Sequence, residues 1–191
     1  MIAKHRLDGL TDAVFGVAMT LLVLDLRLPE SFLPHDGAEL WRAVSDLSTQ
    51  FLAYAISFYV LARRWIGLAG LPVRSDGVAD GFASWALVHL FLIACIPFST
   101  MLVGRFDQFA PSIAIYGLNV ILAALVMLRL VVLAGGPAAE FNDRRAGLIA
   151  LIVVALVSVA VGLLRPTAAM WVYVLLLAVP AWRKWRPGPK P

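Results

Sequence analysis

Six apolar stretches dominate this chain, and a helix of about 20 residues is enough to cross the hydrocarbon core of a bilayer. The stretches lie near residues 9–28, 45–66, 81–104, 110–133, 146–164 and 167–185. Charged residues make up only 15% of the 191-residue chain, against about 25% in soluble domains. We therefore expect an all-α integral membrane protein, with one six-helix transmembrane domain over residues 1–185 and a disordered tail over residues 186–191.

The basic residues predict how these six helices are oriented. Four of the 16 Lys and Arg residues fall on one side of the membrane, namely Arg27, Arg42, Arg105 and Arg165. The other twelve fall on the opposite side, and Lys and Arg are enriched in cytoplasmic loops. The bias predicts a multi-pass protein of the cell (plasma) membrane with both termini in the cytoplasm.

The first stretch, residues 6–29, is apolar yet carries Asp12, Thr20 and Asp25. A charged side chain at the centre of a bilayer costs at least about 2.5 kcal/mol, so this helix should face protein or water rather than lipid alone. Two interpretations of Asp12 remain open. It could cap the helix or interact with the helix dipole in the first turn, or it could be an intramembrane hydrogen-bond anchor or part of an ion entry.

Val17, Leu21 and Leu24 recur in the first stretch at helical spacing, so they share one face of the helix. Thr20 borders that face. These side chains could form an apolar pore constriction with a hydroxyl oxygen nearby. The spacing alone favours the alternative, in which they face lipid or pack against other helices.

The chain offers little for catalysis or for a resident metal. It has no Walker, HExxH or GxSxG motif, so we do not expect an enzyme. Its one cysteine, Cys95, lies inside a predicted span and excludes an intrachain disulfide, and its three histidines are scattered. His89 could ligate haem or relay protons but is more often a packing residue. Pro97 predicts a kink in the third span.

The first stretch resembles the signature of the transmembrane protein 175 family of potassium channels, in its prokaryotic six-helix form. The match comprises Arg6, LTD at residues 10–12 where the family has Phe-Ser-Asp, TLLVL at residues 20–24, and Pro29. Weaker matches follow in later spans at Ser57-Phe58, Trp65, Leu90-Phe91, residues 96–100 and residues 116–119. The chain departs from the family pattern at Leu10-Thr11, at Val17 in place of isoleucine or leucine, and at Leu68 in place of histidine.

This resemblance implies a homotetramer in which the first helix of each subunit lines a central pore that conducts potassium passively. Val17 would then form the narrowest apolar ring, with Leu21 and Leu24 as further rings towards the outside. Thr20 would border the constriction and influence selectivity for potassium. The pore helix would be stabilised from the cytoplasmic side by three residues, Arg6, Thr11 and Asp12.

The same resemblance implies which partners the chain has. These are further copies of the chain, the lipid bilayer and the permeant K⁺ ion, with no resident cofactor or metal and no nucleic acid. Because valine is smaller than isoleucine, a ring of Val17 side chains is expected to leak more, or to select less, than the bulkier ring of relatives.

Two other classes of function remain open from the residues. A small secondary transporter or proton pathway would use Asp12 and His89. A structural membrane subunit or cofactor-binding protein would transport nothing. Potassium flux separates the channel from the structural subunit, and the response to a proton gradient separates it from the proton pathway.

Overall fold

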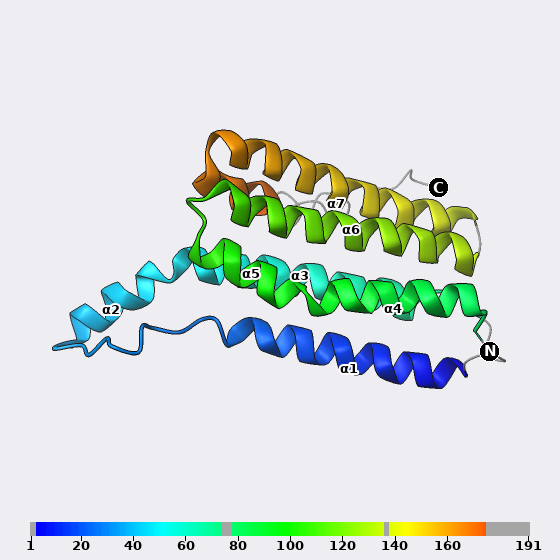
Figure 1. The fold of residues 1–191 in the computed structure, drawn as a ribbon, viewed down its shortest axis with the longest axis horizontal. Helices are drawn as coiled ribbons and strands as arrows, with labels where there is room; N and C mark the ends of the chain where they lie inside the picture. The colour runs from blue at the N-terminus through cyan, green and yellow to red at the C-terminus, as the bar shows by residue number, and fades with distance from the viewer. Residues whose placement is uncertain (1–2, 74–77, 136–137, 175–191) are drawn as a thin grey trace, which may run out of the picture.

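A computed structural model describes residues 3–73, 78–135 and 138–174, and the elements in these ranges are helical. They are α1 (Lys4–Val23), α2 (Gly37–Asp46), α3 (Ser48–Ala69), α4 (Asp80–Ala94), α5 (Ile96–Arg105), α6 (Ala110–Ala134), α7 (Ala138–Leu164) and a short 3₁₀ helix, η1 (Pro166–Ala168). The long helices lie side by side in a bundle, with α1 along one side and α7 along the opposite side (Figure 1). The expected helical class is confirmed.

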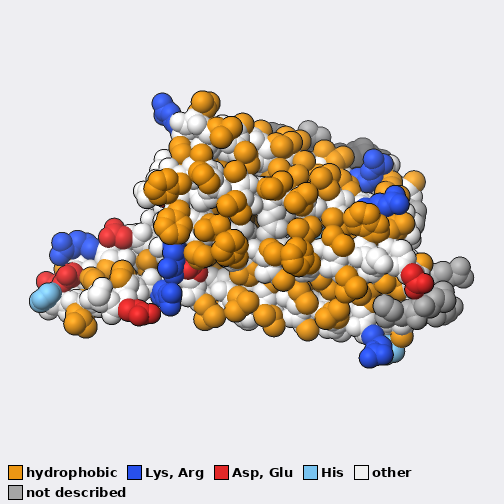
Figure 2. All heavy atoms as spheres, viewed as in Figure 1, with side chains coloured by type: hydrophobic (Ala, Val, Ile, Leu, Met, Phe, Trp, Pro, Cys, Tyr) orange, Lys and Arg blue, Asp and Glu red, His pale blue; other side chains and the backbone are white. Residues whose placement is uncertain are grey.

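Four helical segments among the described residues are long and apolar enough to cross a membrane. They are Ser48–Ala69, Asp80–Arg105, Ala110–Ala134 and Glu140–Leu164, which correspond to the second to fifth predicted stretches. Apolar side chains cover the middle of the visible face of the bundle, and charged side chains gather towards its ends (Figure 2). The surface of the bundle therefore suits a lipid environment.

The first and sixth predicted spans are not among these four apolar segments. α1 has 20 residues, but its first half carries Lys4, Arg6, Asp8 and Asp12, and it is not one of the four apolar segments. The stretch 167–185 lies largely, and the tail 186–191 wholly, outside the described residues. The count of six spans and the side of the termini remain predictions.

The bounds of α1 differ from the predicted span 9–28. The helix begins at Lys4 and ends at Val23, well before Pro29. Its last turn tightens, because the N–H of Leu24 bonds to the carbonyl of Leu21 at 3.2 Å, a 3₁₀-type contact. The next residue, Asp25, pairs with Arg105 at the end of α5 at 2.6 Å. The helix thus ends before any proline, and this ion pair joins the segment that follows it to α5.

The short helix α2 was not predicted. It begins after Asp36, whose side chain accepts a hydrogen bond from the backbone N–H of Glu39 at 2.7 Å. An aspartate followed three residues later by glutamate is a known helix-start pattern, so the sequence did contain the signal. α2 buries none of its residues and projects beyond the end of the bundle (Figure 1).

The interruption predicted at Pro97 is confirmed, since α4 ends at Ala94 and α5 begins at Ile96. Proline has no backbone N–H to donate to the preceding turn. Two hydroxyl groups bond to the carbonyl of Ile96 at this point, from Ser99 at 3.0 Å and from Thr100 at 2.8 Å. The break therefore lies in the middle of one membrane-length segment, Asp80–Arg105.

Small residues and hydroxyl groups determine how the helices of the bundle pack. Gly117 lies where α6 crosses α7, and a Cβ atom added there would stand 2.4 Å from Cγ2 of Val159. Buried hydroxyl groups join α3, α5 and α6: Oγ1 of Thr100 is 2.8 Å from Oγ of Ser57, which is 3.0 Å from the hydroxyl oxygen of Tyr116. Such close backbone approach and interhelical hydrogen bonds are the usual means of holding membrane helices together.

Candidate functional site

The two faces of α1 have different environments. One face is buried against α3, α4 and α5 and consists of Leu7, Thr11, Phe15, Ala18 and Leu22. The opposite face has no partner among the described residues. It contains Val17, which is 58% exposed, and Leu21, which is 44% exposed. Leu24 follows the last helical residue and is 66% exposed. The three residues predicted to form the constriction thus share one outward, apolar surface.

Thr20 lies on this outward surface as well. Its Oγ1 is 3.0 Å from the carbonyl oxygen of Gly16 and 2.9 Å from that of Val17, in its own helix. A hydroxyl group has one proton and two acceptor lone pairs. Because the proton is directed at the helix backbone, the lone pairs of Oγ1 are left to accept from water or to approach a cation. The structure therefore places one hydroxyl oxygen on the same outward surface as Val17 and Leu21.

Asp12 joins α1 to a neighbouring helix. The indole Nε1 of Trp65 on α3 donates to Oδ1 of Asp12 at 2.8 Å. Asp12 is the ninth residue of a helix that begins at Lys4 after the N-cap Ala3, so the cap interpretation of this carboxylate is wrong. Asp12 is a helix-to-helix hydrogen-bond acceptor.

The other two predicted anchor residues, Thr11 and Arg6, have no described side-chain hydrogen bond to a neighbouring helix like that of Asp12. Thr11 is buried, 7% exposed, on the face of α1 that meets the bundle. The side chain of Arg6 is exposed and makes no hydrogen bond or ion pair within the described part of the chain. The three residues are therefore not brought together into one network in this chain.

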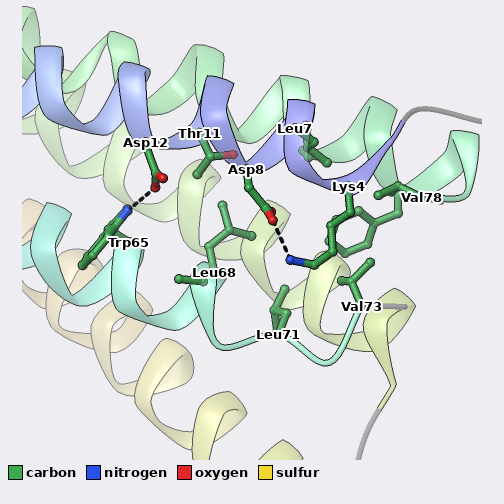
Figure 3. Close-up of a pocket in the computed structure, with 13 residues that line it drawn as sticks. Lys4, Leu7, Asp8, Thr11, Asp12, Trp65, Leu68, Leu71, Val73 and Val78 are labelled. Carbon is green, nitrogen blue, oxygen red and sulfur yellow. Dashed lines mark hydrogen bonds and ion pairs between the residues drawn. The ribbon is translucent and has the colours of Figure 1, made fainter. Parts of the chain in front are cut away.

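A cavity of about 220 Å³ opens beside the Asp12–Trp65 contact, between α1, α3 and α4 (Figure 3). Lys4 donates to Oδ2 of Asp8 at 2.6 Å across its rim. Leu68 also lines the cavity, at the position where the resemblance expects histidine. An apolar side chain therefore lies beneath Thr11 and Asp12, where a polar partner was expected.

His89, the second residue of the alternative proton pathway, is completely buried in α4. Its ring centroid lies 6.1 Å from that of Phe15, and neither ring nitrogen has a hydrogen-bond partner among the described residues. No described hydrogen bond links it towards Asp12 on α1. The described residues also contain no group of three His, Cys, Asp or Glu side chains that could hold a metal.

Sequence reasoning missed Arg64, which lies near the end of the predicted span 45–66 and was counted only among the twelve basic residues on the cytoplasmic side. In the structure Arg64 is only 4% exposed, and its Nη2 donates to the carbonyl of Val120 at 3.3 Å. Its neighbour Arg63 is exposed. Two adjacent arginines point in different directions from a helix, and the sequence carried no signal to say which one turns inward.

Four long apolar helical segments among the described residues, packed in one bundle, are the features of a polytopic α-helical membrane protein. Comparison with known proteins adds the family. Residues 6–97, just under half of the chain, match the family described as endosomal/lysosomal potassium channel TMEM175. The resemblance seen in the first stretch is thereby confirmed over residues 6–97.

Curated potassium channels from bacteria are also similar to the chain. It is 28% identical over 125 residues to a potassium channel of Chryseobacterium sp. (strain P1-3), covering 65% of this chain and 61% of that one. It is 27% identical over 107 residues to one of Streptomyces collinus, covering 56% and 50%. It is 30% identical over 107 residues to one of Chamaesiphon minutus, covering 53% and 49%. The matches thus span about half to three fifths of these relatives.

One solved structure shares the fold. It is the crystal structure of a lysosomal potassium-selective channel TMEM175 homolog from Chamaesiphon minutus, with a TM-score of 0.78 at 23% identity. The match covers 95% of this chain and 97% of that one. The arrangement of helices is therefore that of a known channel over nearly the whole length.

Proposed function

We propose that this chain is one subunit of a potassium-permeable channel that conducts K⁺ passively through a homotetrameric pore. The observation that carries the proposal is the outward face of α1, where Val17, Leu21 and Leu24 are exposed although the opposite face of the same helix is packed. The family described as endosomal/lysosomal potassium channel TMEM175 matches residues 6–97, which contain nearly all of this helix. In a homotetramer this outward face of α1 would line the central pore.

In such a pore the constriction would consist of stacked apolar rings. Val17 and Leu21 are four residues apart, so their rings would be about 6 Å from each other along a helix that rises about 1.5 Å per residue. Apolar rings of this kind gate by excluding water from a narrow passage. Thr20 lies between them in sequence, and one Oγ1 from each of four subunits would give K⁺ four oxygen ligands. Transport then follows the electrochemical gradient.

The anchor residues would keep the pore helix in place. The hydrogen bond from Trp65 to Asp12 fixes α1 against α3 in the charged half of α1. Thr11 adds a buried contact one residue earlier. Arg6 has no partner in its own chain among the described residues, so its part in the anchor would require a neighbouring subunit or a lipid headgroup.

The remaining properties follow from this function. The protein would be a multi-pass protein of the cell membrane, with both termini in the cytoplasm. K⁺ would be its cargo, and no resident cofactor or metal ion would be needed, because passage down a gradient consumes no second substrate. Val17, in place of a bulkier side chain, would give a wider and less selective constriction.

The proposal is tested by measuring ion flux with the purified full-length protein in proteoliposomes. We expect a potassium gradient to drive current, and we expect the reversal potential to follow potassium and to ignore an imposed proton gradient. An absence of flux would contradict the channel function. A reversal potential that follows protons would instead support the pathway through Asp12 and His89.

The place of the constriction is tested with the variant Val17→Ile. Because isoleucine adds one methylene group to each of four side chains in the ring, we expect a smaller single-channel conductance and a higher potassium-to-sodium ratio. Equal conductance and equal selectivity would show that Val17 does not form the narrowest ring.

A further inference from the structure

The cavity beside the Asp12–Trp65 contact is lined by apolar side chains at its floor and by charged side chains at its rim. Its floor is apolar and buried, with Leu7 at 7%, Leu71 at 6%, Val78 at 1% and Phe82 at 7% exposed. Its rim carries charged groups of α1, and Figure 3 shows the Lys4–Asp8 pair at one side and Asp12 at the other. An apolar floor under a few placed polar groups is the usual character of a small-molecule site.

The charged groups of the rim do not cancel. Two carboxylates, from Asp8 and Asp12, face one ammonium group, from Lys4. Lys4 is engaged with Asp8 at 2.6 Å, and Oδ1 of Asp12 is engaged with the neutral indole of Trp65. The Asp12 carboxylate therefore has no cationic partner among the described residues. The lining favours a ligand with a positive charge.

The volume and the floor limit what that cation can be. A cavity of 150 Å³ lined by apolar side chains can hold benzene, so about 220 Å³ holds a ring together with a short amine arm. A bare metal cation would make no contact with the apolar floor, and a lipid chain would not pair with the carboxylates of the rim. The indole of Trp65 lines the same cavity, and indoles attract organic cations.

We propose that this cavity binds a small organic ammonium ion with an apolar body. The ammonium group would contact the carboxylates of Asp8 and Asp12, and the apolar body would lie against Leu68, Phe82 and their neighbours. Leu68 favours this class of ligand, because a histidine at this position would place a polar ring in the floor. A bound cation bridges α1 and α3 at the anchor of the candidate pore helix, so its binding stabilises the contact between the two helices.

The experiment uses benzylammonium as the probe and benzyl alcohol as its neutral control, with the full-length protein in nanodiscs. We expect benzylammonium to raise the unfolding temperature and to saturate, because a ligand that binds only the folded state stabilises it by mass action. Benzyl alcohol, which has the same ring without the charge, should give no saturable increase. Equal effects of the two compounds, or no saturable effect of benzylammonium, would overturn the proposal.

Two variants test whether the probe occupies this cavity. Ala86→Leu fills the floor from α4, and it should abolish saturable binding, whereas Val88→Leu, on the exposed side of the same helix, should leave binding unchanged. Val73→Phe fills the cavity from the loop after α3 and replaces Ala86→Leu if that variant does not fold. Unchanged binding in a folded, filled variant would overturn the proposal.

The charge is tested with Asp8→Asn. Removing a partly exposed ionic contact of up to about 1 kcal/mol should weaken benzylammonium binding up to about fivefold. Asp8 is outside the proposed pore, so potassium flux should stay unchanged. Unaltered affinity in this variant would contradict the role of the rim. Because binding is measured without ion flux, its outcome is independent of whether the chain conducts potassium.

Discussion

The two faces of α1 are similar in composition but opposite in environment. The inward face packs Phe15 at 1% and Leu22 at 2% exposure into the core of the bundle. The outward face presents Val17 at 58% and Leu24 at 66% exposure, with no described residue against them. Both faces are apolar, so hydrophobicity does not distinguish the face that holds the fold together from the face proposed to line the pore.

This difference separates the residues of α1 that stabilise the fold from those proposed to serve conduction. The inward face is determined within one chain, because its partners on α3, α4 and α5 are present. The outward face has no partner among the described residues, so its role depends on what covers it, whether lipid or the further copies of the chain proposed above. Substitutions should therefore separate the faces by their effects: stability for the inward face and conduction for the outward face.

The largest effect is expected from Phe15→Ala. Removing a fully buried aromatic side chain leaves a cavity, and we expect the free energy of unfolding to fall by about 3–5 kcal/mol. Denaturant titration of the purified protein measures the change. The matched control is Val17→Ala on the outward face, which should change the stability of the isolated subunit little. A large loss in both variants would remove the distinction between the faces.

A smaller effect is expected from Gly117→Ala. Its Cβ atom would meet Cγ2 of Val159 at 2.4 Å, and such overpacking costs about 1–3 kcal/mol. The same measurement of unfolding detects it. Gly16→Ala on α1 is the control, because no described atom outside the adjacent part of α1 lies within 4 Å of a Cβ atom there. Stability lost by Gly16→Ala in the separated subunit would mean that α1 packs differently within the chain.

The smallest effect on stability is expected at the anchor of α1. The hydrogen bond from Trp65 to Asp12 is 2.8 Å long but joins two exposed side chains, and we expect about 1 kcal/mol of coupling energy from it. A double-mutant cycle of Asp12→Asn and Trp65→Phe isolates this energy. Additive effects of the two substitutions would show that the bond does not hold α1 against α3.

Part of this fold could be predicted from the sequence, because helices that cross a bilayer require long apolar stretches. Long apolar stretches predicted the second to fifth apolar helical segments, although the fifth begins at residue 140 rather than 146, and Pro97 predicted the break between α4 and α5. α1 ends earlier than the predicted span 9–28, and the ion pair just after its end, between Asp25 and Arg105, joins residues 80 positions apart that local sequence does not connect. The inward turn of Arg64 is also a property of the packed bundle and not of its local sequence.

At the candidate site, too, part of the arrangement could be predicted from the sequence and part could not. Helical spacing placed Val17, Leu21 and Leu24 on one face, and the structure shows them exposed together. Spacing could not reveal which face of α1 packs, since the residues Leu7, Phe15 and Leu22 repeat with similar spacing and similar hydrophobicity. The partner of Asp12 was equally hidden, because Trp65 lies 53 positions away in sequence.

The measurement that tests the central claim most directly is the accessibility of Val17 to a water-soluble reagent. In a Val17→Cys variant that also carries Cys95→Ala, a charged methanethiosulfonate reagent should block potassium current, since each modified side chain would obstruct the constriction. The control is Val153→Cys on the exposed face of α7, where the same reagent should leave the current unchanged. Persistent current after confirmed modification at Val17, or a cysteine there that reacts only with lipid-soluble reagents, would contradict the account.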